Sequence, residues 1–172
     1  MQQLYLTGPH ASQVAQQLFT ALNVRPAGYQ LLPFSVEGAV RGEALHLLLP
    51  PAAPMDNDVP CRIRLRSGDW AVVPRVLDEI AAPNLLRALT VHTPILLQGL
   101  TAQMLTCTAF REAVVSCLTG PRPVIVAADD DAEELLRALT PGETQLWMPI
   151  PSTAEGRSAL LEELVTEAAL RL

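Results

Sequence analysis

Apolar and polar residues follow two different periods along this chain. Continuous apolar runs, and strict alternation of apolar with polar residues, predict strands. Such runs occur at residues 2–7, 28–36, 40–49, 61–66, 93–98, 123–128 and 144–150. Apolar residues spaced three and four positions apart predict helices. These occur at residues 11–22, 73–90, 107–119, 131–139 and 153–170.

The order of these segments predicts an α/β fold in a single domain spanning residues 1–172. Segments 93–98 and 123–128 are apolar throughout, which is typical of parallel strands buried on both faces. Strands that alternate with helices form a largely parallel sheet covered on both faces, a three-layer sandwich. The turn EGAVRG at 37–42 predicts a hairpin, and CRIRLR at 61–66 alternates strictly. Both should add antiparallel strands at one edge of the sheet.

Two of the predicted helices carry local signals. Pro83 lies within the segment 73–90 and should kink or split that helix, because proline lacks a backbone N–H group. Ser152 and Glu155 have the spacing of a capping box, which predicts that the last helix begins near Thr153.

The charge balance excludes several classes of protein. The net charge is −6 and the pI is about 5.0, which argues against a nucleic-acid-binding protein. All twelve basic residues are arginine, so no chemistry that needs a lysine amine is available. The three dispersed cysteines argue against a zinc site and suit a reducing compartment. No secretory signal and no membrane-spanning run is evident, so we expect a cytoplasmic protein.

The stretch LYLTGPHASQVAQQL at 4–18 reads as a strand, a glycine turn and a helix, a layout that can hold a phosphate. Together with ILLQGLTAQMLTCTAFREAVVSCL and PSTAEGRSALLEEL, it resembles the small thermophilic-type, or cancer-related, nucleoside-triphosphatases. The glycines of AGYQ, EG and RG lie where that family has a glycine-bearing hairpin. Glu155 and Arg157 match its closing helix, whereas Gly156 does not. The resemblance implies a P-loop-NTPase-like fold and an ancestral nucleoside-triphosphate phosphohydrolase activity.

The resemblance also locates the catalytic positions, and this chain departs from the family at them. A phosphate loop needs G-x-x-x-x-G-K-[ST], with glycines for convergent N–H groups, lysine for phosphate charge and a hydroxyl for magnesium. The corresponding residues are, in order, Gly8, Pro9, His10, Ala11, Ser12, Gln13, Val14 and Ala15. Gln98 and Gly99 stand at the positions of the Walker B Asp and Glu. One preorganised charge contact stabilises a transition state by about 2.7–4 kcal/mol. We therefore expect no useful magnesium-dependent hydrolysis.

The sequence allows two interpretations for each of two features at the carboxyl edge of the sheet. Residues 8–10 and the following helix N-terminus either bind an anion or form a tight turn with Ser12 near the helix start. Arg157 is either part of a former nucleotide site or one member of a surface ion pair.

The sequence also allows two interpretations for each of two charged clusters. Period two places Arg62, Arg64 and Arg66 on one face of a strand, where they either bind phosphates or an acidic partner, or form a charged guard face. Residues 129–131, all aspartate, follow a buried strand and either bind a metal ion or cap the next helix.

The leading hypothesis is a degenerate nucleoside-triphosphatase-like protein without a catalytic residue, cofactor or metal, acting as a binding or assembly module. Its partner would be another protein or a second copy of the chain, and neither nucleic acid nor membrane. The alternative keeps binding of a magnesium nucleotide, or weak activity, through Arg62, Arg64, Arg66 or Arg157 and the first helix N-terminus. A third hypothesis is an unrelated enzyme that uses residues 129–131.

Overall fold

The computed structural model describes residues 3–48, 58–141 and 145–169. The predicted element ends at residues 2, 49, 144 and 170 lie outside these ranges. In chain order the elements are β1 (Gln3–Thr7), α1 (Ala11–Ala21), β2 (Ala27–Val36), β3 (Ala39–Leu47), β4 (Val59–Arg64), β5 (Trp70–Val72), α2 (Pro74–Val76), η1 (Leu77–Ala81), α3 (Ala82–Ala88), β6 (Ile95–Leu100), η2 (Met104–Thr106), α4 (Thr108–Thr119), β7 (Val124–Ala128), η3 (Asp130–Ala132), α5 (Glu133–Leu139), β8 (Gln145–Pro149) and α6 (Ala154–Ala169).

The described strands form one eight-stranded mixed sheet in the order β5-β4-β3-β2-β6-β7-β1-β8. The strands β2, β6, β7, β1 and β8 pair with one another in parallel. The pairs β2–β3, β3–β4 and β4–β5 are antiparallel. The predicted α/β fold, with a mostly parallel centre and an antiparallel addition at one edge, is confirmed.

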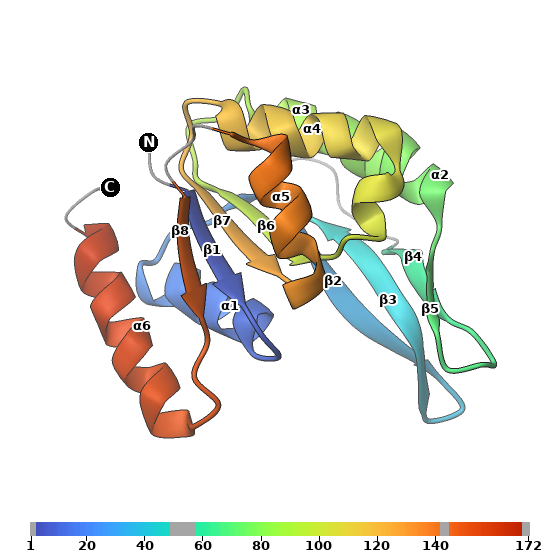
Figure 1. Ribbon diagram of the computed structural model, residues 1–172, viewed down its shortest axis with the longest axis horizontal. Coiled ribbons are helices and arrows are strands. Elements are labelled where there is room, and N and C mark those ends of the chain that lie inside the picture. Colours follow the sequence, from blue (N-terminus) through green and yellow to red (C-terminus); the bar gives the residue numbers. More distant parts are fainter. Residues whose placement is uncertain (1–2, 49–57, 142–144, 170–172) are drawn as a thin grey trace.

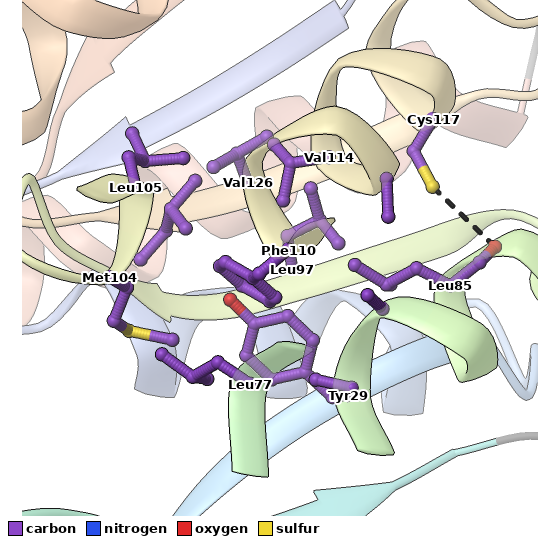
Figure 2. Close-up of a cluster of buried hydrophobic side chains, with 14 of the residues drawn as sticks. Tyr29, Leu77, Leu85, Leu97, Met104, Leu105, Phe110, Val114, Cys117 and Val126 are labelled. Carbon is purple, nitrogen blue, oxygen red and sulfur yellow. Dashed lines mark hydrogen bonds between the residues drawn. The ribbon is translucent and has the colours of Figure 1, made fainter. Parts of the chain in front are cut away.

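Helices cover the two faces of the sheet (Figure 1). Helices α3, α4 and α5 pack on one face, where the buried side chains of Tyr29, Leu97 and Phe110 belong to the larger hydrophobic core. Figure 2 shows this core, in which the Tyr29 and Phe110 rings lie 5.8 Å apart. Helices α1 and α6 pack on the other face, where Val14 and Leu164 belong to a second core. The central parallel strands β6, β7 and β1 are thereby buried on both sides.

The close contact between β2 and β6 explains why residue 28, in the AGYQ segment, is a glycine. Gly28 has φ +101°, and a Cβ atom at this position would lie 2.2 Å from the Leu96 carbonyl oxygen. Any other residue would push the two parallel strands apart.

The helical segment 73–90 is divided, as Pro83 predicts. It divides into α2, a π-helical turn at η1, and α3. The Ala82 N–H group bonds to the Leu77 carbonyl, five residues earlier. The wide turn comes just before Pro83, whose ring lacks an N–H group and crowds the carbonyl four residues back, so the expected irregularity is present.

The capping box expected at Ser152 and Glu155 is wrong. Helix α6 begins at Ala154, and the Thr153 Oγ1 atom accepts a hydrogen bond from the Gly156 N–H group at 3.1 Å. Threonine is itself a capping residue, so the cap lies one position later than the spacing suggested. Glycine fits the third helical position, because a Cβ atom there would lie 2.8 Å from the Cβ atom of Pro151.

Within the described ranges, no helix combines the length and the apolarity needed to cross a bilayer.

Candidate functional site

The connection between β1 and α1 is a turn of three residues, Gly8, Pro9 and His10. Gly8 has φ +100°, and its carbonyl accepts a hydrogen bond from the Ala11 N–H group at 3.1 Å. The His10 carbonyl accepts from the Val14 N–H group at 3.0 Å, so the helix is already regular at its first turn. The tight turn is therefore present at the position that the resemblance assigned to a phosphate loop.

The second part of the phosphate-loop window lies inside α1. Val14 and Ala15, at the positions of the loop's lysine and hydroxyl residue, are completely buried in the core beneath the sheet. Ser12 is half-buried and Gln13 is exposed. The backbone directs the side chain of residue 14 into the core, where a phosphate cannot be reached.

The N-terminus of α1 has no side-chain cap. His10 is the N-cap residue, and its side chain makes no capping hydrogen bond. Ser12 lies within the first turn of the helix and does not cap it either. The helix dipole and the first N–H groups therefore face the turn without a side-chain acceptor.

Gln98 and Gly99 lie at the carboxyl end of β6, as the resemblance placed them. Gln98 is buried, and its Oε1 atom accepts a hydrogen bond from Gln16 Nε2 of α1 at 3.1 Å. Gln16 Nε2 also donates to Gln30 Oε1 of β2 at 3.0 Å. The carboxamide of Gln98 is thus fixed against α1 by a neutral partner.

Gly99 forms an irregularity in the strand. It has φ +77°, and the register between β6 and β7 shifts between Gln98 and Leu100. A Cβ atom on Gly99 would lie 2.7 Å from the Leu31 side chain. The position that the family fills with an acidic residue therefore has little room for any side chain here.

Arg62 is held by two neighbours that the sequence did not suggest. Its Nη1 atom donates to Glu43 Oε2 at 2.7 Å, and its Cζ atom lies 4.9 Å from the centre of the Trp70 ring. The Arg62 side chain is only 12% exposed. The pair forms beside an irregularity in the register between β3 and β4. The charge of Arg62 is already offset by a carboxylate, which reduces its capacity to bind phosphate.

The expected single face of three arginines is wrong for Arg66. Strand β4 ends at Arg64, and the chain then turns, with the Leu65 N–H group bonded to the Asp69 carbonyl at 2.8 Å. Arg66 lies in this turn and so outside the strand's alternation. Arg64 and Arg66 are both exposed.

The contacts of Arg157 among the described residues are with backbone carbonyls and not with a carboxylate, so the expected surface ion pair is not seen there. Its Nη1 atom donates to the carbonyls of Ser152 at 2.6 Å and Pro151 at 3.3 Å. Arg157 thus fixes the loop between β8 and α6. That loop lies beside the first turn, because the Ile150 N–H group bonds to the Thr7 carbonyl at 2.9 Å.

The three aspartates at 129–131 make no side-chain cap on η3 or α5. Instead, Asp131 Oδ1 accepts a hydrogen bond from the Ala102 N–H group at 3.1 Å, across the loop that follows β6. The capping prediction is wrong because the helix entry orients Asp131 toward the neighbouring loop. Partial burial raises the pKa of Asp129, and the Arg62 guanidinium opposes this effect.

Metal binding was the other interpretation of these aspartates. The described residues hold no group of three or more His, Cys, Asp or Glu side chains that could bind a metal ion.

The structure brings together the ends of β1, β6, β7 and β8 at one edge of the sheet. The Asp129 N–H group bonds to the Leu100 carbonyl at 2.9 Å, which joins the ends of β6 and β7. Residues 8–10, Gln98 and Arg157 belong to this edge. Arg64 and Arg66 lie away from it, on β4 and in the β4–β5 turn (Figure 1). The four arginines do not converge on one anion site.

Sequence reasoning missed Gln16, Gln30 and Glu43. Gln98 gave a usable signal, since a polar side chain that closes an apolar strand buried on both faces needs a hydrogen-bond partner. The identity of the partner depends on the crossing of α1 over β2 and β6, which the sequence does not specify.

Two solved structures are similar to this chain over nearly their full lengths. The crystal structure of THEP1 from the hyperthermophile Aquifex aeolicus has a TM-score of 0.67 at 17% identity, with 96% of this chain and 98% of that chain covered. The solution structure of a human cancer-related nucleoside triphosphatase has a TM-score of 0.69 at 17% identity, with coverage of 98% and 97%. The chain has the P-loop NTPase fold.

No protein-family model and no curated protein matches the chain. The likeness to the two structures, at 17% identity, is one of fold.

Proposed function

We propose that this chain is a degenerate nucleoside-triphosphatase-like protein that no longer hydrolyses nucleoside triphosphates and acts as a binding or assembly module. The observation that carries the proposal is the burial of Val14 at the position of the phosphate-loop lysine, one helical turn inside α1. No small side-chain movement can bring a cation to a phosphate from this position.

The state of Gln98 supports the same proposal. A hydrolytic site of this kind needs a carboxylate that holds magnesium through its oxygen atoms. Gln98 carries no charge, and its oxygen already accepts a hydrogen bond from Gln16. Loss of one charge contact costs about 2.7–4 kcal/mol in the transition state, and this chain lacks several.

Phosphate release from ATP, GTP, CTP and UTP with magnesium tests the loss of hydrolysis. We expect release indistinguishable from a blank without protein. Turnover of about 1 per second or more, within the usual range of enzymes, would contradict the proposal if Gln98→Ala or His10→Ala abolished it. A turnover that both variants leave unchanged would identify a contaminating enzyme.

The binding role is supported by apolar side chains on the two antiparallel hairpins. Val36, Val40, Ile63 and Leu65 are each 40–51% exposed, and all four lie on or beside β2, β3 and β4. Clustered exposed apolar residues commonly mark protein interaction sites. The proposed partner is therefore another protein or a second copy of this chain.

Sedimentation velocity over a range of concentrations distinguishes the two kinds of partner. If the partner is a second copy, Ile63→Glu should weaken association, whereas Leu86→Glu on α3, an equally exposed control, should not. A monomer at every concentration would contradict self-association.

A second candidate function is nucleotide binding without hydrolysis, and the uncapped N-terminus of α1 favours it. Arg64 and Arg66 are the arginines of the original set that remain exposed without a carboxylate partner among the described residues. A ligand at 100 times its Kd stabilises a protein by about 2.7 kcal/mol. A melting temperature that does not change with millimolar nucleotide, with or without magnesium, would contradict this candidate.

The proposed location is the cytoplasm. All three cysteines are free thiols and buried, which suits a reducing compartment.

A further inference from the structure

A groove lies between the second half of α1 and strand β2. Its volume is about 700 Å³, which is within the usual range of ligand sites. Arg25 and Pro26, which precede β2, form one of its walls. The groove therefore extends from the amino end of β2 along the strand to Leu32. Residues 8–10, which follow the carboxyl end of β1, do not line it (Figure 1).

The walls of the groove are apolar where they meet the sheet. Phe19 of α1 is buried beside Leu96 of β6, and Leu32 and Leu48 extend this surface across the hairpin. An apolar body can therefore replace water along one side of the groove.

The polar groups of the groove include both donors and acceptors. Gln16 donates its amide hydrogens to both Gln30 Oε1 and Gln98 Oε1. Because the Gln30 oxygen faces Gln16, its NH2 group points elsewhere, and in the described part of the chain it donates to no residue. Arg25 contributes an exposed guanidinium, and its backbone is fixed by the Thr93 hydroxyl, which donates to the Arg25 carbonyl.

The charge of the groove is opposite to that of the whole chain. The chain has a net charge of −6, yet among the described residues that line the groove Arg25 is the one with a charge, and none is Asp or Glu. The nearby carboxylate of Asp58 is bonded to His46 at 2.8 Å. One cation beside an apolar surface without carboxylates complements an anion attached to an apolar body.

We propose that this groove binds a small amphiphilic anion, with its oxyanion head at Arg25 and its apolar body on Phe19, Leu32 and Leu48. The site is separate from the edge of the sheet at residues 8–10. It therefore does not depend on whether the chain hydrolyses or binds nucleotides.

The test compares decanoate with decanol, which has the same apolar body without the charge. Each displaces the fluorescent anion 1-anilinonaphthalene-8-sulfonate from the full chain, and the displacement gives a Kd. We expect Arg25→Gln to raise the Kd of decanoate about tenfold, since a charged hydrogen bond contributes about 1.5 kcal/mol. The Kd of decanol should change less than about twofold. Arg41 is an exposed arginine on β3 that does not line the groove. Arg41→Gln should therefore leave the Kd values of decanoate and decanol unchanged.

A second variant tests the location of the apolar body. Thr20 is exposed on the α1 wall of the groove, so Thr20→Trp should fill the groove without disturbing the core. We expect it to abolish displacement by both compounds while the circular dichroism spectrum and the melting temperature stay unchanged. The proposal is overturned if decanol binds as tightly as decanoate, or if a folded Thr20→Trp variant binds decanoate normally.

Discussion

The guanidinium of Arg62 lies between the Glu43 carboxylate, at 2.7 Å, and the face of the Trp70 ring, at 4.9 Å. These three residues belong to three consecutive antiparallel strands, β3, β4 and β5. The short edge strand β5 is joined to the sheet by few backbone pairs. The side-chain contacts of Arg62 therefore contribute to holding this edge in register.

Replacing Arg62 should destabilise the chain more than replacing an exposed arginine. Arg62→Ala leaves a partly buried Glu43 without its partner, which should cost about 1–3 kcal/mol in the free energy of unfolding. Arg75→Ala is the matched control, since the Arg75–Glu79 pair is 83% and 61% exposed and such pairs contribute about 0–1 kcal/mol. Urea denaturation measures both values. Equal losses in the two variants would show that the Arg62 contacts do not stabilise the edge.

The N-terminus of α4 is capped by a residue from another helical segment. Asp78 Oδ1 of η1 accepts a hydrogen bond from the Phe110 N–H group at 2.9 Å, and the N-cap residue Cys107 makes no side-chain cap. Asp78→Ala should therefore destabilise the chain by about 0.5–2 kcal/mol, as for the loss of an N-cap. Glu79→Ala, one residue later and exposed, should have a much smaller effect in the same urea titration. A larger loss in Glu79→Ala than in Asp78→Ala would disprove this capping role.

Restoring the phosphate-loop lysine should not restore hydrolysis. Val14 is completely buried, so Val14→Lys places an unpaired charge in the core and should cost about 3–5 kcal/mol. Gln13→Lys adds the same side chain at the exposed neighbouring position and should be tolerated. Thermal melting and phosphate-release assays on both variants test this. A stable Val14→Lys protein that hydrolyses ATP would show that residue 14 reaches the phosphate position after all.

The sequence predicts the fold well because burial controls its pattern. The runs ILLQ and PVIVAA are apolar on both faces, as parallel strands covered by helices must be, and they form β6 and β7. Strand β5 was missed because its three residues, WAV, are too short to show any period.

The candidate site could be predicted less well, because its contacts join distant parts of the chain. Gln16 is 14 residues from Gln30 and 82 residues from Gln98, and only the packing of α1 on the sheet brings them together. The pairing of Arg62 with Glu43 depends on a register shift between β3 and β4. Neither residue spacing nor periodicity contains this information.

Buried thiols should give the stability of this chain a distinct dependence on pH. Burial raises the pKa of Cys117 to about 12, against an ordinary value of about 8.5. Between these values the unfolded chain loses the thiol proton while the folded chain keeps it. The unfolded state then binds fewer protons, so the free energy of unfolding falls as pH rises, by about 1.4 kcal/mol per pH unit for one such thiol.

Cys117→Ala isolates this effect. It should lower stability at pH 8, because it removes a buried side chain in contact with the Leu85 carbonyl (Figure 2). Between pH 9 and pH 10, however, the variant should lose about 1 kcal/mol less than the unaltered chain, since one titrating thiol is gone and the unfolded thiol is only partly ionised at pH 9. Ser116→Ala, at the neighbouring position of α4, should change stability equally at both pH values. Urea denaturation at pH 8, 9 and 10 measures all three proteins, and parallel pH profiles for Cys117→Ala and the unaltered chain would show that the Cys117 thiol ionises normally in the folded state.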